Sequence, residues 1–132
     1  MDKIDLVYVI DDDPLYIFSM KKLLKLSDFC NEALYFKNAQ EALDTFRSNI
    51  SQNKALPDVV FLDISMPLMN GWQFLDELVT LPIIGDLKIF IVSSSIDPFD
   101  MEKSKSYEIV TDYIYKPITI NKITELKEKL LT

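Results

Sequence analysis

Charged residues follow directly after three short apolar segments of this chain, residues 6–10, 59–62 and 113–115. The charged residues are Asp11, Asp12, Asp13, Asp63 and Lys116. Apolar runs of this length are typical of buried parallel strands. The carboxyl ends of parallel strands meet at one edge of a sheet, where open α/β sheets bind their ligands. We therefore expect these carboxylates and the ammonium group to lie close together.

Several carboxylates at one sheet edge repel one another, so the arrangement needs a cation unless some of them are protonated. Carboxylate oxygens are hard ligands, which select Mg²⁺ or Ca²⁺. Magnesium fits better, because it binds through a few carboxylates and keeps waters or phosphate oxygens in its other positions. In the alternative interpretation, each acid is only a solvated turn residue or a helix cap.

The composition of the chain limits its function classes. Its 132 residues predict one domain, and the net charge of -7 argues against direct nucleic-acid binding, which needs a basic surface. No apolar run approaches the ~20 residues that a membrane span requires. No export signal is visible, so we expect a cytoplasmic protein that does not bind membranes.

The rarity of two residue types excludes further classes. The chain has no histidine, so it cannot hold a Ser-His-Asp triad, a histidine metal site or a phosphohistidine. It has only two glycines, Gly71 and Gly85, and therefore no glycine-rich phosphate-binding loop.

Strand-like and helix-like segments alternate along the whole chain. We predict strands at residues 6–10, 33–36, 58–62, 88–92 and 113–115, and helices at residues 39–49, 72–81 and 98–106. We also predict a first helix that begins at Pro14, and a last helix that begins at Ile120; their apolar faces extend to Leu24 and Leu130. Asp13, Asn38, Asp97 and Thr119 precede four of these helices as N-caps, and Asn38 with Glu41 resembles a capping box. This alternation predicts a doubly wound α/β fold, in which helices cover both faces of a five-stranded parallel sheet.

Four segments together resemble the receiver domain of two-component response regulators. They are Val-Ile-Asp-Asp-Asp-Pro at 9–14, Phe-Leu-Asp-Ile-Ser-Met-Pro at 61–67, Val-Ser-Ser at 92–94 and Tyr-Ile-Tyr-Lys-Pro at 113–117. Their order and spacing match across essentially the whole chain. The resemblance implies the flavodoxin-like strand order 2-1-3-4-5, a single receiver domain over residues 1–132, and no output domain.

The resemblance also implies a role for each residue of the acidic edge. Asp63 matches the phosphoacceptor, whose carboxylate attacks a phosphohistidine on a sensor histidine kinase or histidine phosphotransfer protein. Asp12 matches a direct Mg²⁺ ligand and Asp11 a ligand acting through water, while the Ser65 backbone carbonyl is a further ligand. Lys116 is expected to pair with Asp63 and then with the phosphoryl oxygens.

Two further residues match the switch that reads the phosphoryl group. The Ser93 hydroxyl is expected to move toward it, and the Tyr113 ring to repack into the space that Ser93 leaves. Leu68 departs from the family, which often has glycine there, so the turn after Met66-Pro67 could have a different backbone. The family often has a cis bond before the proline at position 117.

We expect a protein that assists its own Mg²⁺-dependent phosphorylation and dephosphorylation, is not a turnover enzyme, and binds a downstream protein target. One alternative is a haloacid dehalogenase-type phosphatase with Asp11 as nucleophile. That enzyme needs an acidic motif after the fourth strand, where this chain has Ser93, Ser94 and Ser95. A second alternative is a receiver-like module that docks partners without being phosphorylated.

Overall fold

The computed structural model describes residues 3–83 and 85–132, along which strands and helices alternate. The elements are β1 (Ile4–Ile10), α1 (Pro14–Leu26), β2 (Cys30–Phe36), α2 (Ala39–Ser51), β3 (Val59–Leu62), α3 (Gly71–Leu78), β4 (Lys88–Ser93), α4 (Pro98–Ser104), β5 (Val110–Tyr115) and α5 (Ile120–Leu131). All strand pairs are parallel, in the order β2-β1-β3-β4-β5. The predicted fold class and strand order are confirmed.

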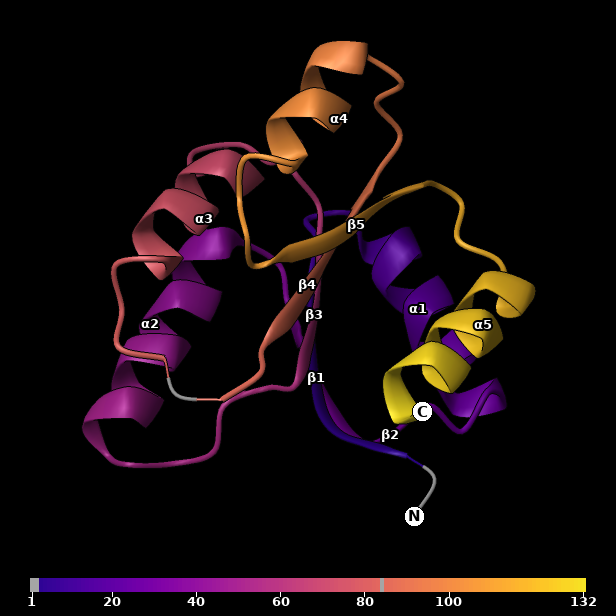
Figure 1. The fold of residues 1–132 in the computed structure, drawn as a ribbon, viewed down its shortest axis with the longest axis horizontal. Coiled ribbons are helices and arrows are strands. Elements are labelled where there is room, and N and C mark those ends of the chain that lie inside the picture. The colour runs from indigo at the N-terminus through magenta and orange to yellow at the C-terminus, as the bar shows by residue number, and fades with distance from the viewer. Residues whose placement is uncertain (1–2, 84) are drawn as a thin grey trace.

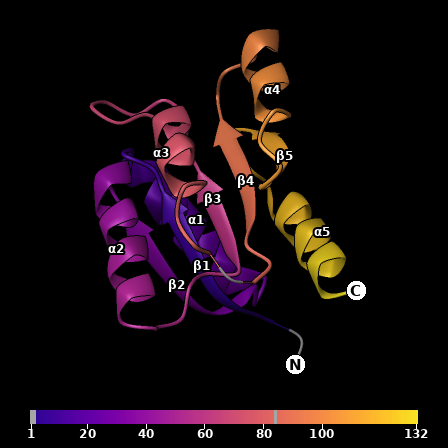
Figure 2. The same ribbon diagram turned by 60° about the vertical axis from the view of Figure 1, so that its left-hand side comes forward.

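Helices cover both faces of the sheet, as predicted (Figure 1). α1 and α5 lie on one face and α2 and α3 on the other, while α4 lies beside β5 at one end of the molecule (Figure 2). No helix within residues 3–83 and 85–132 is long and apolar enough to cross a membrane.

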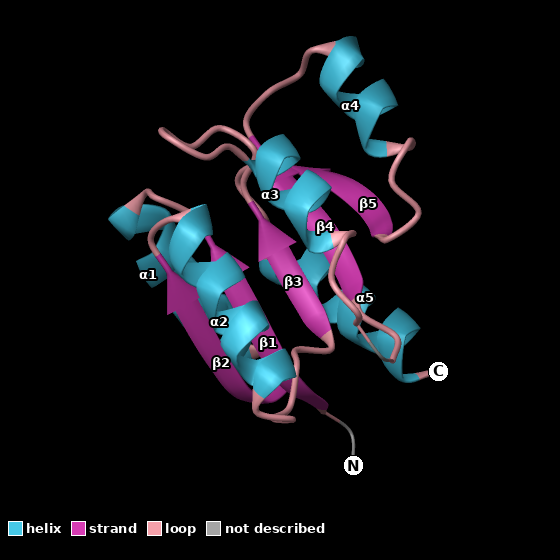
Figure 3. Ribbon diagram, turned by 90° about the vertical axis from the view of Figure 1, so that its left-hand side faces the viewer, coloured by secondary structure: helices cyan, strands magenta, loops and turns pink. Residues whose placement is uncertain are grey.

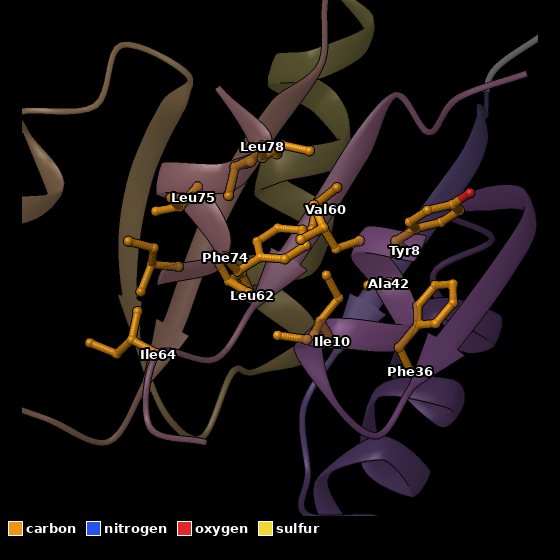
Figure 4. Packing of buried hydrophobic residues seen from close by; sticks show 14 of the residues in the cluster. Tyr8, Ile10, Phe36, Ala42, Val60, Leu62, Ile64, Phe74, Leu75 and Leu78 are labelled. Atoms are coloured by element: carbon orange, nitrogen blue, oxygen red, sulfur yellow. The ribbon is translucent and has the colours of Figure 1, made fainter. Parts of the chain in front are cut away.

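Each face of the sheet has its own hydrophobic cluster. On the α2 and α3 side, the Tyr8 ring packs against Phe36 and Phe46, with ring centroids 4.9 and 5.2 Å apart. Figure 4 shows Phe74, Leu75 and Leu78 of α3 over this side of the sheet. On the α1 and α5 side, the buried residues include Val7, Val9, Met20, Leu24, Phe61, Phe90, Ile123 and Leu126. The two clusters fix the helices on the sheet and so fix the loops between them.

The helix caps follow the sequence with one correction. The side chains of Asp13, Asn38, Asp97 and Thr119 each accept a backbone N–H of the helix that follows, as predicted. Among the described residues, however, the reciprocal capping box is at Asn70 and Gln73, which begin α3, and not at Asn38.

The strands at the two edges of the sheet are longer than the sequence predicted. β2 begins at Cys30 instead of residue 33, and β5 begins at Val110 instead of residue 113. Both begin with half-buried and exposed residues, because an edge strand has less of its surface covered, and their apolar pattern is weak there. Helices α3 and α4 end earlier than predicted, at Leu78 and Ser104.

The strand register brings the charged strand ends together. All strands run toward the same end of the sheet (Figure 3). Ile10 pairs with Leu62 across β1 and β3, so Asp11 and Asp63 leave the sheet side by side. Ser93 pairs with Tyr115 across β4 and β5, which places Lys116 at the same edge.

Candidate functional site

Three carboxylates meet at the carboxyl edge of the sheet, as predicted. Asp11, Asp12 and Asp63 each offer one oxygen, and these oxygens all lie within 4.8 Å of one another. Asp11 is 1% exposed and Asp63 is 5% exposed, whereas the Asp12 side chain is open to solvent. Two of the three charges are therefore held away from water.

The backbone fixes both buried acids. The Asp63 N–H donates to the Ile10 carbonyl at 3.0 Å, and the Asp11 N–H donates to the Phe36 carbonyl at 3.0 Å. Gly71 lets α3 begin directly against the end of β3: a Cβ there would lie 2.7 Å from Ile64 Cα and 2.8 Å from the Asp63 carbonyl oxygen. The close packing of α3 on this strand end needs a residue without a side chain.

Lys116 reaches both buried carboxylates. Its Nζ lies 2.8 Å from Asp11 Oδ2 and 3.8 Å from Asp63 Oδ2. The predicted pairing of Lys116 with Asp63 is therefore present, and a shorter ion pair joins Lys116 to Asp11. Asp11 is the most buried of the three acids, and its charge most needs a neighbouring cation because water is excluded.

Crowding and burial make both buried acids harder to ionise. Burial and the nearby Asp11 charge raise the pKa of Asp63 from 3.8 to about 6, although the Ser65 N–H and Lys116 oppose this shift. Burial likewise raises the pKa of Asp11, against the stabilising effect of Lys116. The site therefore has more negative charge than one ammonium group compensates.

The residues present fit a divalent cation. Three carboxylates face a single ammonium group, whose shortest contact is 2.8 Å to Asp11 Oδ2. A hard cation would supply the missing positive charge, and an all-oxygen ligand set favours Mg²⁺ over softer metals.

The loop between β3 and α3 forms one wall of the site. The Ser65 N–H donates to Asp63 Oδ1 at 3.1 Å, which orients that carboxylate and leaves Oδ2 toward Lys116. Leu68 has a φ of 68°, so it takes the left-handed conformation that glycine usually provides, and its side chain is fully exposed. The leucine thus keeps a glycine-like φ in this turn.

Ser93, at the carboxyl end of β4, and Tyr113, on β5, belong to one hydrogen-bonded network with Ser95. Ser93 is fully buried, and its Oγ accepts the Ser95 N–H at 3.0 Å. The buried Tyr113 side chain donates its hydroxyl to the Ser95 carbonyl at 3.0 Å. The Ser95 hydroxyl donates to Asp100 Oδ2 on α4 at 2.6 Å. Ser95 therefore connects both predicted switch residues to α4.

Three other residues complete the description of the site. Asp13 caps α1 by accepting the Leu15 N–H, as predicted. The Lys116-Pro117 peptide bond is cis. Tyr16, on the first turn of α1, was not predicted: its ring lies under Lys116 Nζ, 4.3 Å from the ring centroid. No sequence signal marks it, because its spacing on the helix is that of an ordinary half-buried residue.

Comparison with known proteins gives a consistent result. The model of the response regulator receiver domain family matches residues 7–128. An uncharacterized response regulatory protein of Vibrio cholerae is 33% identical over 91% of this chain, and one of Staphylococcus epidermidis is 29% identical over 95%. This chain spans 42% and 46% of those two proteins, less than half of their length.

Solved structures of similar length share the fold. The crystal structure of a two component response regulator from Cytophaga hutchinsonii superposes with a TM-score of 0.85 at 28% identity. The match covers 98% of each chain. The similarity therefore extends over the whole sheet and all five helices that the structure describes.

Proposed function

This chain belongs to the family of response regulator receiver domains, and we propose that, as such a domain, it accepts a phosphoryl group on the Asp63 carboxylate. The donor is a phosphohistidine on a sensor histidine kinase or a histidine phosphotransfer protein. The observation that carries this proposal is the buried Asp63 side chain between two further acids and Lys116. Membership of this family argues against the alternative, a phosphatase with Asp11 as nucleophile.

Asp63 is the best placed of the acids to act as nucleophile. One oxygen, Oδ1, is held by the Ser65 N–H, while Oδ2 faces Lys116. An Asp63 oxygen forms a bond to phosphorus as the bond between phosphorus and the donor imidazole nitrogen breaks, and the nitrogen keeps the electron pair. The product is an aspartyl phosphate and a free histidine on the donor.

Asp12, Asp11, Asp63 and the Ser65 backbone carbonyl would hold Mg²⁺, which supplies positive charge to the phosphoryl oxygens when bound. The exposure of Asp12 supports its role as a direct ligand. Asp11 has one oxygen facing Lys116 and the other accepting the Asp13 N–H at 2.9 Å, which supports a role through water.

Lys116 stabilises the charge that the phosphoryl group brings to Asp63. Its Nζ already lies between Asp11 and Asp63, so it needs only a small shift to reach a phosphoryl oxygen. The Ser93 hydroxyl, on the adjacent strand, would donate a hydrogen bond to a phosphoryl oxygen. Rotation of the Ser93 side chain toward that oxygen would break the hydrogen bond that its Oγ accepts from the Ser95 N–H. Through Ser95, Tyr113 and Asp100 that change reaches α4, where a downstream protein binds.

The test is an intact-mass measurement on the wild-type protein after incubation with acetyl phosphate. We expect one phosphoryl group to be added with Mg²⁺ present and none with a chelator in its place. A chain that stays unmodified under both conditions would instead be a docking module that is not phosphorylated, acting at the same surface.

We also propose that the protein works in the cytoplasm, without turning over a separate substrate.

Metal binding should depend strongly on Asp12. We expect Asp12→Ala to weaken Mg²⁺ binding at least about tenfold, because a direct charged ligand is lost from a site of few ligands. Calorimetric titration of the metal-free proteins measures this affinity. Asp13→Asn, which keeps the α1 cap beside the site, is the matched control, and equal affinity of Asp12→Ala and wild type would contradict the assignment.

Ser93→Ala should separate phosphorylation from its consequences. We expect it to accept a phosphoryl group within about threefold of the wild-type rate, because the hydroxyl reads the group rather than receiving it. The amide chemical-shift changes that beryllofluoride and Mg²⁺ cause at Ser95, Tyr113 and α4 should shrink. Chemical-shift changes as large as those of wild type at these positions would show that the Ser93 hydroxyl does not transmit phosphorylation to α4.

A further inference from the structure

Tyr16 is an aromatic side chain of the site without an assigned role. It follows the Asp13 cap on the first turn of α1, and its half-buried ring packs on the hydrophobic cluster of the α1 and α5 side. Its hydroxyl is buried and has no hydrogen-bond partner among the described residues. Tyr16 therefore contacts the site through its ring and not through its hydroxyl.

The ring forms one of three sides that enclose the Lys116 ammonium group. Nζ lies 2.8 Å from Asp11 Oδ2, 3.8 Å from Asp63 Oδ2 and 4.3 Å from the Tyr16 ring centroid. The lysine side chain is 17% exposed, so little water screens these contacts. A cation over an aromatic ring is attracted most strongly when it is desolvated in this way.

Other lysines in the described residues contact rings at longer range. Lys21, Lys22 and Lys103 lie 5.0 to 5.9 Å from the centroids of Tyr35, Phe18, Trp72 and Phe99. The Lys116 contact is the shortest of these, and its lysine belongs to the acidic site. The Lys21 ammonium group also lies over a tyrosine ring, that of Tyr35, but this pair is not part of the acidic site. A substitution of Tyr35 is therefore a suitable control.

We propose that Tyr16 is a positioning residue for phosphoryl transfer, whose ring holds the Lys116 ammonium group between Asp11 and Asp63. The inference rests on the proposed function. Without the ring, the ammonium group keeps its ion pair with Asp11 but loses the surface that restrains its sideways movement. The long lysine side chain then samples positions away from Asp63, and fewer molecules have the charge in place for transfer.

The ring is also suited to this role electrostatically. Burial and the charges of Asp11 and Asp63 raise the pKa of the Tyr16 hydroxyl, so the side chain stays neutral at neutral pH. A neutral ring restrains the lysine without competing with Asp63 as a second anion. Phenylalanine would provide the same surface, so the hydroxyl is dispensable for positioning.

The test compares the phosphorylation rates of Tyr16→Leu, Tyr16→Phe and Tyr35→Leu with acetyl phosphate and Mg²⁺. We expect Tyr16→Leu to be about tenfold slower, and Tyr16→Phe to stay within about twofold of wild type because it keeps the ring. Tyr35→Leu removes a half-buried tyrosine of the same cluster that also lies beneath a lysine, and we expect no change in its rate. If Tyr16→Leu does not fold, Tyr16→Met takes its place.

A spectroscopic measurement separates positioning from a general structural effect. The Lys116 ε-methylene protons should show an upfield ring-current shift in wild type and Tyr16→Phe that is lost in Tyr16→Leu, while Mg²⁺ affinity stays unchanged. A folded Tyr16→Leu protein that is phosphorylated at the wild-type rate would overturn the proposal. An absent ring-current shift in wild type would also overturn it. If wild type itself is not phosphorylated, the proposed function fails, and the ring-current shift still decides whether Tyr16 holds Lys116.

Discussion

Asp63→Asn should abolish the uptake of a phosphoryl group from acetyl phosphate. The variant keeps the shape of the side chain and an oxygen that can accept the Ser65 N–H, but it has no carboxylate to attack phosphorus. Intact-mass analysis in the presence of Mg²⁺ measures the result. Asp13→Asn, the same change at an exposed acid near the site, should be phosphorylated like wild type. Uptake by Asp63→Asn at the wild-type rate would place the acceptor elsewhere.

The same substitution should stabilise the metal-free protein at neutral pH by about 2 kcal/mol. Burial and the Asp11 charge raise the pKa of Asp63 to about 6, above the 3.8 of an unperturbed carboxyl. The folded state therefore binds a proton more tightly than the unfolded state, and wild type loses stability as pH rises from about 4 to about 6. Asp63→Asn carries no charge and escapes this loss.

Chemical denaturation across pH measures the difference in the free energy of unfolding. The advantage of Asp63→Asn should be full above about pH 6 and vanish below about pH 4, where the wild-type carboxyl is protonated in both states. Mg²⁺ should reduce the advantage by stabilising wild type more. Asp13→Asn is again the control, since it preserves a good helix cap. If Asp63→Asn increases the free energy of unfolding equally at low and neutral pH, burial and the Asp11 charge do not raise the pKa of Asp63.

Much of the site could be predicted from the sequence because parallel strands impose its geometry. Apolar runs mark β1, β3 and β5, and in a parallel sheet their charged followers share one edge, which brings Asp11, Asp63 and Lys116 together. The strand order itself came from the resemblance to the family. The first residues of β2 and β5 were not predicted as strand, because these edge strands begin with exposed and half-buried residues and their apolar pattern is weak there.

The contacts inside the site depend on details that a sequence does not contain. Which acid lies nearer Lys116 is decided by side-chain rotamers and by how deeply Asp11 is buried, not by spacing. Tyr16 shows the same limit, since its position on α1 predicts a partly buried face but not that the lysine following β5 lies above its ring. Such partners come from segments 100 residues apart and appear only once the sheet is assembled.

The location of the phosphoryl group on the wild-type protein tests the central claim most directly. Hydroxylamine converts an acyl phosphate into a hydroxamate, which marks the modified residue for peptide mapping by mass spectrometry. After incubation with acetyl phosphate and Mg²⁺, we expect the hydroxamate at Asp63, and none in samples treated with a chelator. A hydroxamate at Asp11 or Asp12, or phosphate that hydroxylamine does not release, would contradict the assignment of Asp63 as phosphoacceptor.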